Sequence, residues 1–143
     1  MADLTSRRFI LFRLGSLPCA APASVVREVI PAGHPTRIPG APVQVAGLLN
    51  LRGALLTVVD GRRALGVEAP EDAESVLVVE RGDRSFGLAV DEVLDLVDLP
   101  PDDLAPGESL PGVDPRLVIG VGRHDGRVFA VLDTAALLGP ALD

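Results

Sequence analysis

The residue types that most often carry chemistry are scarce in this chain. It has one cysteine, Cys19, and two histidines, His34 and His124, among 143 residues. Cys19 has no cationic neighbour in the sequence to lower its pKa, and a single cysteine excludes an internal disulfide. Neither histidine has a second histidine or a cysteine at the spacing of metal ligands. We therefore expect no catalytic residue, no metal site and no cofactor.

Two aspartates occupy equivalent places at the ends of predicted strands. Asp60 follows the apolar run 54–59, and Asp133 follows the apolar run 128–132. A pair of carboxylates can serve as general acid and general base. Their repetition favours a structural role instead, in which each side chain caps the turn that follows its strand.

The exception to this scarcity is the segment 50–53, which reads Asn-Leu-Arg-Gly at the tip of a predicted hairpin. Arg52 is the one charged residue between Val45 and Val59. An arginine in such a place needs either a carboxylate partner or open solvent, and a rim of valines and leucines also suits a protein interface. From the residues alone, a solvated turn and an interface anchor are equally good interpretations.

The scaffold around this tip is duplicated. Residues 45–66 and 118–139 follow one pattern and align without a gap. The matched residues are Gly47 and Gly120, Gly53 and Gly126, Val58 and Val131, Asp60 and Asp133, Leu65 and Leu138, and Gly66 and Gly139. The tips differ, because Arg52 aligns with Asp125. A duplicated unit that varies at its tip indicates one common scaffold and one specialised surface.

Composition and charge restrict the fold and the class of function. The chain is 48% hydrophobic but 3% aromatic, so aliphatic side chains must fill its core, which favours closely spaced β layers. Its 15 glycines and 13 prolines indicate many short elements joined by turns. A net charge of -7 argues against a nucleic-acid surface. No apolar run approaches the roughly 18 to 20 residues of a membrane span, and we expect a cytoplasmic protein.

Hairpins dominate the expected secondary structure. The predicted strands cover residues 9–14, 17–21, 43–51, 54–59, 76–81, 85–90, 117–121 and 128–132. Residues 25–30 fit a helical turn or a strand equally well, and residues 134–138 a short turn or helix. The two repeat units, about 9–66 and 76–139, are each too small to bury a core alone. We therefore predict a single domain over residues 1–143, all-β, built as two packed barrels between which strands cross.

Longer motifs extend this pattern over nearly the whole chain. They read Phe9-x-x-Phe12-x-Leu14-Gly15, Pro22-x-x-x-Val26-Arg27-Glu28-Val29-Ile30, Val45-x-Gly47-Leu48-Leu49-Asn50-Leu51-Arg52-Gly53 and Gly87-Leu88-x-Val90-Asp91-Glu92-Val93. With these motifs, about residues 8–139 resemble the CheW-like family, that of the chemotaxis coupling protein. The resemblance implies two packed five-stranded SH3-like β-barrels with a few short helical turns, and no catalysis.

The resemblance also implies partners and contact residues. A protein of this family holds a CheA-type histidine kinase, through its regulatory domain, on the cytoplasmic tip of a chemoreceptor, a methyl-accepting protein. By similarity, Arg52, Asn50 and Glu28 would contact the receptor. Val26 and Gly47 match positions associated with kinase contact.

Two other functions stay open at this point. The chain departs from the family pattern at Thr57 and Gly61, and it ends at Asp143, soon after Leu138. A protein that engages only one of the two partners, as an array spacer or in a non-chemotactic pathway, therefore remains an alternative. A ligand-binding β-barrel is a third interpretation, which the scarcity of aromatic residues disfavours.

Overall fold

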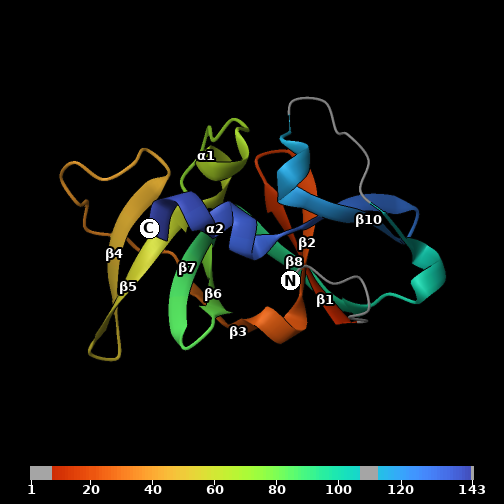
Figure 1. The fold of residues 1–143 in the computed structure, drawn as a ribbon, viewed down its shortest axis with the longest axis horizontal. Helices are drawn as coiled ribbons and strands as arrows, with labels where there is room; N and C mark the ends of the chain where they lie inside the picture. Colours follow the sequence, from red (N-terminus) through yellow and green to blue (C-terminus); the bar gives the residue numbers. More distant parts are fainter. Residues whose placement is uncertain (1–7, 107–112, 143) are drawn as a thin grey trace.

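The computed structural model describes residues 8–106 and 113–142, which form eleven strands and two α-helices (Figure 1). The strands are β1 (Arg8–Leu14), β2 (Leu17–Pro22), β3 (Val26–Pro31), β4 (Val45–Leu51), β5 (Ala54–Asp60), β6 (Ser75–Arg81), β7 (Arg84–Val90), β8 (Glu92–Asp98), β9 (Leu104–Pro106), β10 (Val118–His124) and β11 (Arg127–Leu132). The helices are α1 (Gly61–Leu65) and α2 (Thr134–Leu142), with 3-10 turns at Ala23–Val25, Pro101–Asp103 and Pro115–Leu117. The prediction of a mainly β fold is confirmed.

The strands form two sheets, which lie side by side in Figure 1. The six-stranded sheet has the order β8-β1-β2-β11-β10-β9, and the five-stranded sheet has the order β3-β6-β7-β5-β4. The hairpin β1–β2 thus belongs to a sheet otherwise made from the second half of the chain, as expected if strands cross between the units. The short strand β9 gives one sheet six strands, where the resemblance implied five.

The sequence repeat is also a repeat of strand pairing. Val58 of β5 pairs in parallel with Gly87 of β7, and Val131 of β11 pairs in parallel with Ala20 of β2. The hairpins β4–β5 and β10–β11 both shift register at their start, between Val45 and Gly47 and between Val118 and Gly120. Val58 and Val131 are matched positions of the sequence repeat, so their pairing partners Gly87 and Ala20 are equivalent as well. This second correspondence superimposes β2 on β7 and β3 on β8.

The structure resolves the two segments whose type the sequence left open. Residues 26–31 are the edge strand β3, held by antiparallel pairing of Ile30 with Val76 of β6. Residues 134–142 form a helix, α2, which is longer than the predicted turn. Over the described residues, no helix has the length and apolar character needed to cross a membrane.

Three apolar clusters hold the sheets together. One lies inside each sheet, around Phe9 and Phe129 in the six-stranded sheet and around Val58 and Val76 in the five-stranded sheet. The largest lies between the sheets and under both helices; it contains Phe12, Cys19, Leu77, Leu88, Leu132, Leu137 and Leu138. The outer strands β3 and β4 both send side chains into the cluster of the five-stranded sheet, so that sheet curves around its own core.

Candidate functional site

Arg52 lies at the turn of the β4–β5 hairpin in a left-handed backbone conformation. Its φ is 50° and that of Gly53 is 87°, the pair of positive values that a tight two-residue hairpin turn requires. The side-chain Oδ1 of Asn50 accepts a hydrogen bond of 2.9 Å from the backbone N–H of Gly53. The turn therefore has a fixed shape, and Arg52 leaves it in a defined direction.

A bidentate ion pair joins this tip to the edge strand β3. The guanidinium of Arg52 donates from Nη2 to Oε2 of Glu28 at 2.6 Å and from Nη1 to Oε1 at 3.2 Å. These hydrogen bonds, together with the positive charge of Arg52, hold the pKa of Glu28 below its ordinary value. Arg52 is 66% exposed and Glu28 is 29% exposed, so the pair lies at the surface. It connects β3 and β4, the two outer strands of the five-stranded sheet.

Two exposed apolar side chains lie on the strands that carry the ion pair, and the sequence did not single them out. Val29 follows Glu28 on β3, on the opposite face of the strand, and is 44% exposed. Leu55 lies opposite Asn50 in the β4–β5 hairpin and is 70% exposed. Leu55 belongs to an almost continuous apolar run, in which an outward-facing position has no distinguishing signal. We call Glu28, Val29, Asn50, Arg52 and Leu55 the tip face.

Val26 lies at the start of β3, two residues before Glu28. It is half-buried, opposite Val79 of β6, and packs against the cluster between the sheets. The pairing shifts between Val26 and Glu28, so Arg27 is the bulged residue of this edge strand. The strand thus presents one residue toward the junction of the sheets and another toward the tip face.

Gly47 is buried and holds a loop against β4. The backbone N–H groups of Thr36 and Leu48 each donate to the carbonyl oxygen of the other at 2.8 Å. Gly47 has a φ of 145°, and a Cβ at this position would overlap the carbonyl oxygen of Thr36. Only glycine allows this approach. Gly47 therefore offers no side chain to a partner; it positions the loop between β3 and β4, on which Ile38 and Val43 are exposed.

A buried network of charges spans the junction of the sheets, and the sequence did not predict it. Nε of Arg62 donates to Oδ1 of Asp60 at 2.8 Å, and Nη2 donates to Oδ2 at 3.1 Å. Nη1 of the same residue donates to Oδ1 of Asp91 at 3.0 Å. The other oxygen of Asp91 accepts from the backbone N–H of Gly15, in the β1–β2 turn. One guanidinium thus links the five-stranded sheet to a turn of the six-stranded sheet.

Both repeated aspartates cap helices. Asp60 accepts from the backbone N–H of Arg62 at 3.0 Å, and Asp133 accepts from that of Ala136 at 3.1 Å. Burial alone would raise the pKa of Asp60, but the hydrogen bonds and charge of Arg62 outweigh it, with help from the backbone N–H of Arg63, and the pKa is lowered. The predicted capping role is confirmed, and Asp60 also has a charged partner that Asp133 lacks among the described residues.

Several carboxylates at the start of β8 and along it have partners. Asp91 is 6% exposed and belongs to the buried network. Glu92 pairs with Arg13, and Asp98 pairs with Arg8, both across β1 and both at 3.2 Å. These pairs fix the outer strand β8 to β1.

The scarce reactive residues lie apart from one another. Cys19 is buried in the cluster between the sheets, and burial raises the pKa of its thiol to about 12. His34 is exposed in the loop after β3. Nε2 of His124 lies 3.4 Å from Oδ2 of Asp125 at the β10–β11 tip. Among the described residues, no three of His, Cys, Asp and Glu gather as metal ligands would. The arrangement suits recognition by shape and charge at the tip face.

Known proteins share the sequence pattern and the fold of this chain. A family model described as a CheW-like domain matches residues 8–141. The chain is 32% identical over 130 residues to a chemotaxis protein CheW of Rhizobium meliloti, covering 89% of this chain and 84% of that protein. It is 27% identical to a chemotaxis protein CheW of Helicobacter pylori, covering 92% and 81%. The fold matches that of the scaffolding protein TtCheW of Thermoanaerobacter tengcongensis with a TM-score of 0.82 at 22% identity, over 90% and 89% of the two chains.

Proposed function

The chain belongs to the CheW-like family, and on that premise we propose that this CheW-type adaptor couples a CheA-type histidine kinase to the cytoplasmic tip of a chemoreceptor. It works in the cytoplasm and catalyses no reaction. The observation that carries the proposal is the ion pair between Glu28 and Arg52, which is bidentate and lies at the surface.

The tip face is preorganised for binding. The left-handed turn and the pairing with Glu28 restrict the Arg52 side chain, so little conformational entropy remains to be lost on binding. An arginine has five N–H donors, and the pair with Glu28 uses two of them. The remaining donors suit carboxylate or carbonyl oxygens of a receptor, while Val29 and Leu55 add apolar contact. We assign receptor contact to Arg52 and Glu28, with Asn50 as support of the turn.

Kinase contact is assigned to the neighbouring surface along β3 and the loop after it. Val26 begins β3 at the junction of the sheets. Gly47 acts through the loop that it holds, where Ile38 is 38% exposed and Val43 is 75% exposed. Exposed aliphatic side chains on a loop anchored by a backbone bridge are suited to an apolar partner surface.

Calorimetric titration of the purified chain with a receptor-tip fragment, and separately with the kinase regulatory domain, tests the proposal. Arg52→Ala should weaken receptor binding roughly tenfold or more, because it removes a central charged anchor. Arg52→Lys should restore part of that loss, since an ammonium cannot form the bidentate fork. Kinase binding should change less than receptor binding.

The matched control is Asp125→Ala, at the equivalent tip of the second hairpin, which should leave receptor binding unchanged. Equal affinities for the parent and Arg52→Ala would remove Arg52 from the receptor site. A parent chain that binds one fragment and not the other would replace the coupling function by an adaptor for a single partner.

A further inference from the structure

The starts of the two helices are equivalent places in the duplicated fold. Asp60 caps α1 and Asp133 caps α2, at matched positions of the sequence repeat. In the next positions of each helix, Arg62 corresponds to Ala135. Ala20 is equivalent to Gly87, because each pairs with a matched residue of the repeat. Ser24 follows Ala20 at the same distance along the chain as Asp91 follows Gly87, so Ser24 is the counterpart of Asp91.

In the first half, a guanidinium takes up part of this place, and a smaller pocket of about 210 Å³ remains beside it, lined by Asp60 and Arg62. Arg62 is 4% exposed and lies between the carboxylates of Asp60 and Asp91. The carbonyl oxygen of Glu71, in the linker before β6, accepts a further hydrogen bond of 2.9 Å from Nη1. A guanidinium beside the first turn of a helix opposes the helix dipole, and here the capping carboxylate and a second carboxylate compensate for it.

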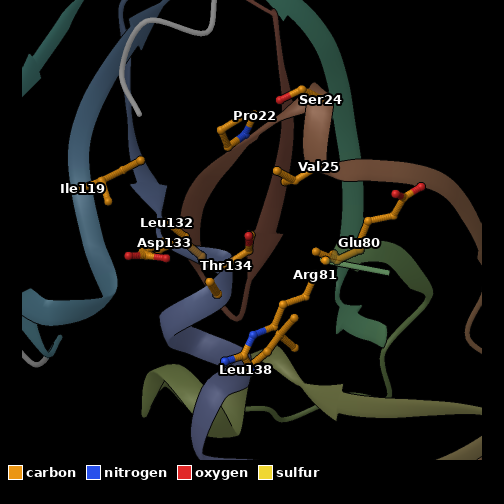
Figure 2. A pocket seen from close by; sticks show the side chains of 13 residues that line it. Pro22, Ser24, Val25, Glu80, Arg81, Ile119, Leu132, Asp133, Thr134 and Leu138 are labelled. Carbon is orange, nitrogen blue, oxygen red and sulfur yellow. The ribbon is translucent and has the colours of Figure 1, made fainter. Parts of the chain in front are cut away.

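In the second half, the same place is a pocket of about 350 Å³ (Figure 2). Ala135 and Ser24 line it where the first site has Arg62 and Asp91, and the capping carboxylate of Asp133 remains. Its apolar walls come from Pro22, Val25, Ile119, Leu132 and Leu138. This volume falls at the lower end of the range of pockets that hold small ligands, about 300 to 1,000 Å³.

Two polar groups in the pocket have unused hydrogen-bonding capacity. Thr134 is 8% exposed and lines the pocket, and its hydroxyl has no hydrogen-bond partner among the described residues. Asp133 uses Oδ1 for the N–H of Ala136, which leaves Oδ2 without a donor from the described residues. Among the described residues no buried side-chain oxygen lacks a partner, so both groups open onto the pocket, where acceptor oxygens without donors suit a ligand that brings N–H groups.

We propose that this pocket accepts the side chain of an arginine from a binding partner, in the place that Arg62 occupies in the first half. The guanidinium would donate to Asp133 and to the hydroxyl of Thr134, and the aliphatic stem would lie along the apolar walls. This inference goes beyond the proposed coupling function, because the pocket shares no residue with the tip face and its test needs neither kinase nor receptor.

The charged residues of the chain around the pocket do not fill it. Glu80 and Arg81, at the β6–β7 turn, line its rim and are exposed. In Figure 2, Arg81 runs along α2 toward Leu138 rather than toward Asp133, and Glu80 points away from the pocket. The rim charges cancel, so Asp133 leaves the pocket with a net negative charge.

Titration of the isotope-labelled full chain with N-acetyl-arginine amide, followed by backbone amide shifts, tests the proposal. We expect saturable shifts at Ser24, Val25 and 134–136, with a dissociation constant on the order of 1 mM for so small a probe. N-acetyl-lysine amide should bind several-fold more weakly. Asp133→Asn should weaken binding roughly tenfold or more, and asparagine caps a helix about as well as aspartate, so the variant should fold.

A plugged variant makes the test specific to this pocket. Ala135→Arg places an arginine where Arg62 lies in the first half; arginine favours helix at this exposed position, and binding of the probe should disappear. Arg81→Ala should leave the affinity unchanged or raise it. Equal shifts for the arginine and lysine probes, full binding by Ala135→Arg, or loss of binding in Arg81→Ala would each overturn the proposal.

Discussion

The hairpin tips β4–β5 and β10–β11 share a backbone but differ in charge. Arg52 and Asp125 occupy the same turn position with φ values of 50° and 51°. The correspondence that carries β3 onto β8 places Asp95 where the first half has Glu28. One tip therefore has an arginine paired with a glutamate, whereas the other has two aspartates, and Asp95 accepts from its own neighbour Leu96 instead. The turn geometry is a property of the scaffold, and the charge at the tip varies independently of it.

The apolar side chains beside the tips are kept in both halves. Val29 corresponds to Leu96, and Leu55 corresponds to Val128; all four are exposed. The two tips thus keep exposed aliphatic positions and differ in charge.

The largest expected change in stability is at the start of α1, where the capping aspartate also pairs with a buried arginine. Asp60→Ala removes a cap and leaves the guanidinium of Arg62 buried with one partner fewer, so we expect the free energy of unfolding to fall by about 3 to 5 kcal/mol. Asp133→Ala removes a cap alone and should cost about 0.5 to 2 kcal/mol. Urea denaturation monitored by circular dichroism measures both. Equal losses would mean that the buried network adds nothing to the cap.

Gly47 and Gly53 lie in the same hairpin but are needed for different reasons. Gly47 makes room for the Thr36 carbonyl, and Gly53 adopts the positive φ of the turn. Gly47→Ala would drive a Cβ into the Thr36 carbonyl, and we expect a loss of about 3 kcal/mol or more. Gly53→Ala meets open space and should cost about 1 to 2 kcal/mol, the strain of a left-handed alanine. Thermal unfolding of the two variants side by side provides the measurement. A milder effect at Gly47 than at Gly53 would show that the loop moves aside.

Acid should reduce stability through Asp60. The lowered pKa means that the folded protein binds fewer protons here than the unfolded chain. This stabilisation is complete above the unfolded pKa of about 3.9 and is lost as the pH falls through the folded pKa. The urea midpoint of the parent should therefore drop as the pH falls below about 3.9. Asp60→Asn should show a smaller drop, and an equally steep one would assign the loss to other carboxyls.

The smallest effect concerns the titration of Glu28. In Arg52→Ala the hydrogen bonds that lower the pKa of this carboxyl are gone, so its pKa should rise toward its ordinary value. Carboxyl-carbon NMR across an acid titration measures it directly. Asp125→Ala is the control and should leave the pKa of Glu28 where it is in the parent. An unchanged value in Arg52→Ala would mean that the ion pair does not persist in solution.

Much of the fold could be predicted because hairpins and repeats are local patterns. Turn residues and alternating apolar positions located the hairpins, and the alignment of the two repeats located the equivalent tips. The distribution of strands between the sheets could not be assigned in the same way, because it depends on long-range pairings such as that of Cys19 with Ala130. The type of β3 was ambiguous for the same reason, since its partner β6 lies in the other repeat unit.

In the candidate site, too, the local features could be predicted and the long-range contacts could not. The tip residue Arg52 stood out as a lone charge in an apolar stretch, and Asn50 next to it has a local role. Its partner Glu28 lies on another strand, so only the curvature of the sheet brings the two together. Arg62 gave no signal, because an arginine near a helix start is usually solvated, and burial alone distinguishes it.

The placement of the β1–β2 hairpin has a consequence for synthesis of the chain. The parallel partner of β2 is β11, which follows every other strand in the described part of the chain, so the six-stranded sheet is incomplete until β11 has left the ribosome. Such distant pairing raises the contact order and slows folding. The apolar residues of β1, Phe9 and Phe12 among them, must wait in the nascent chain for strands not yet translated.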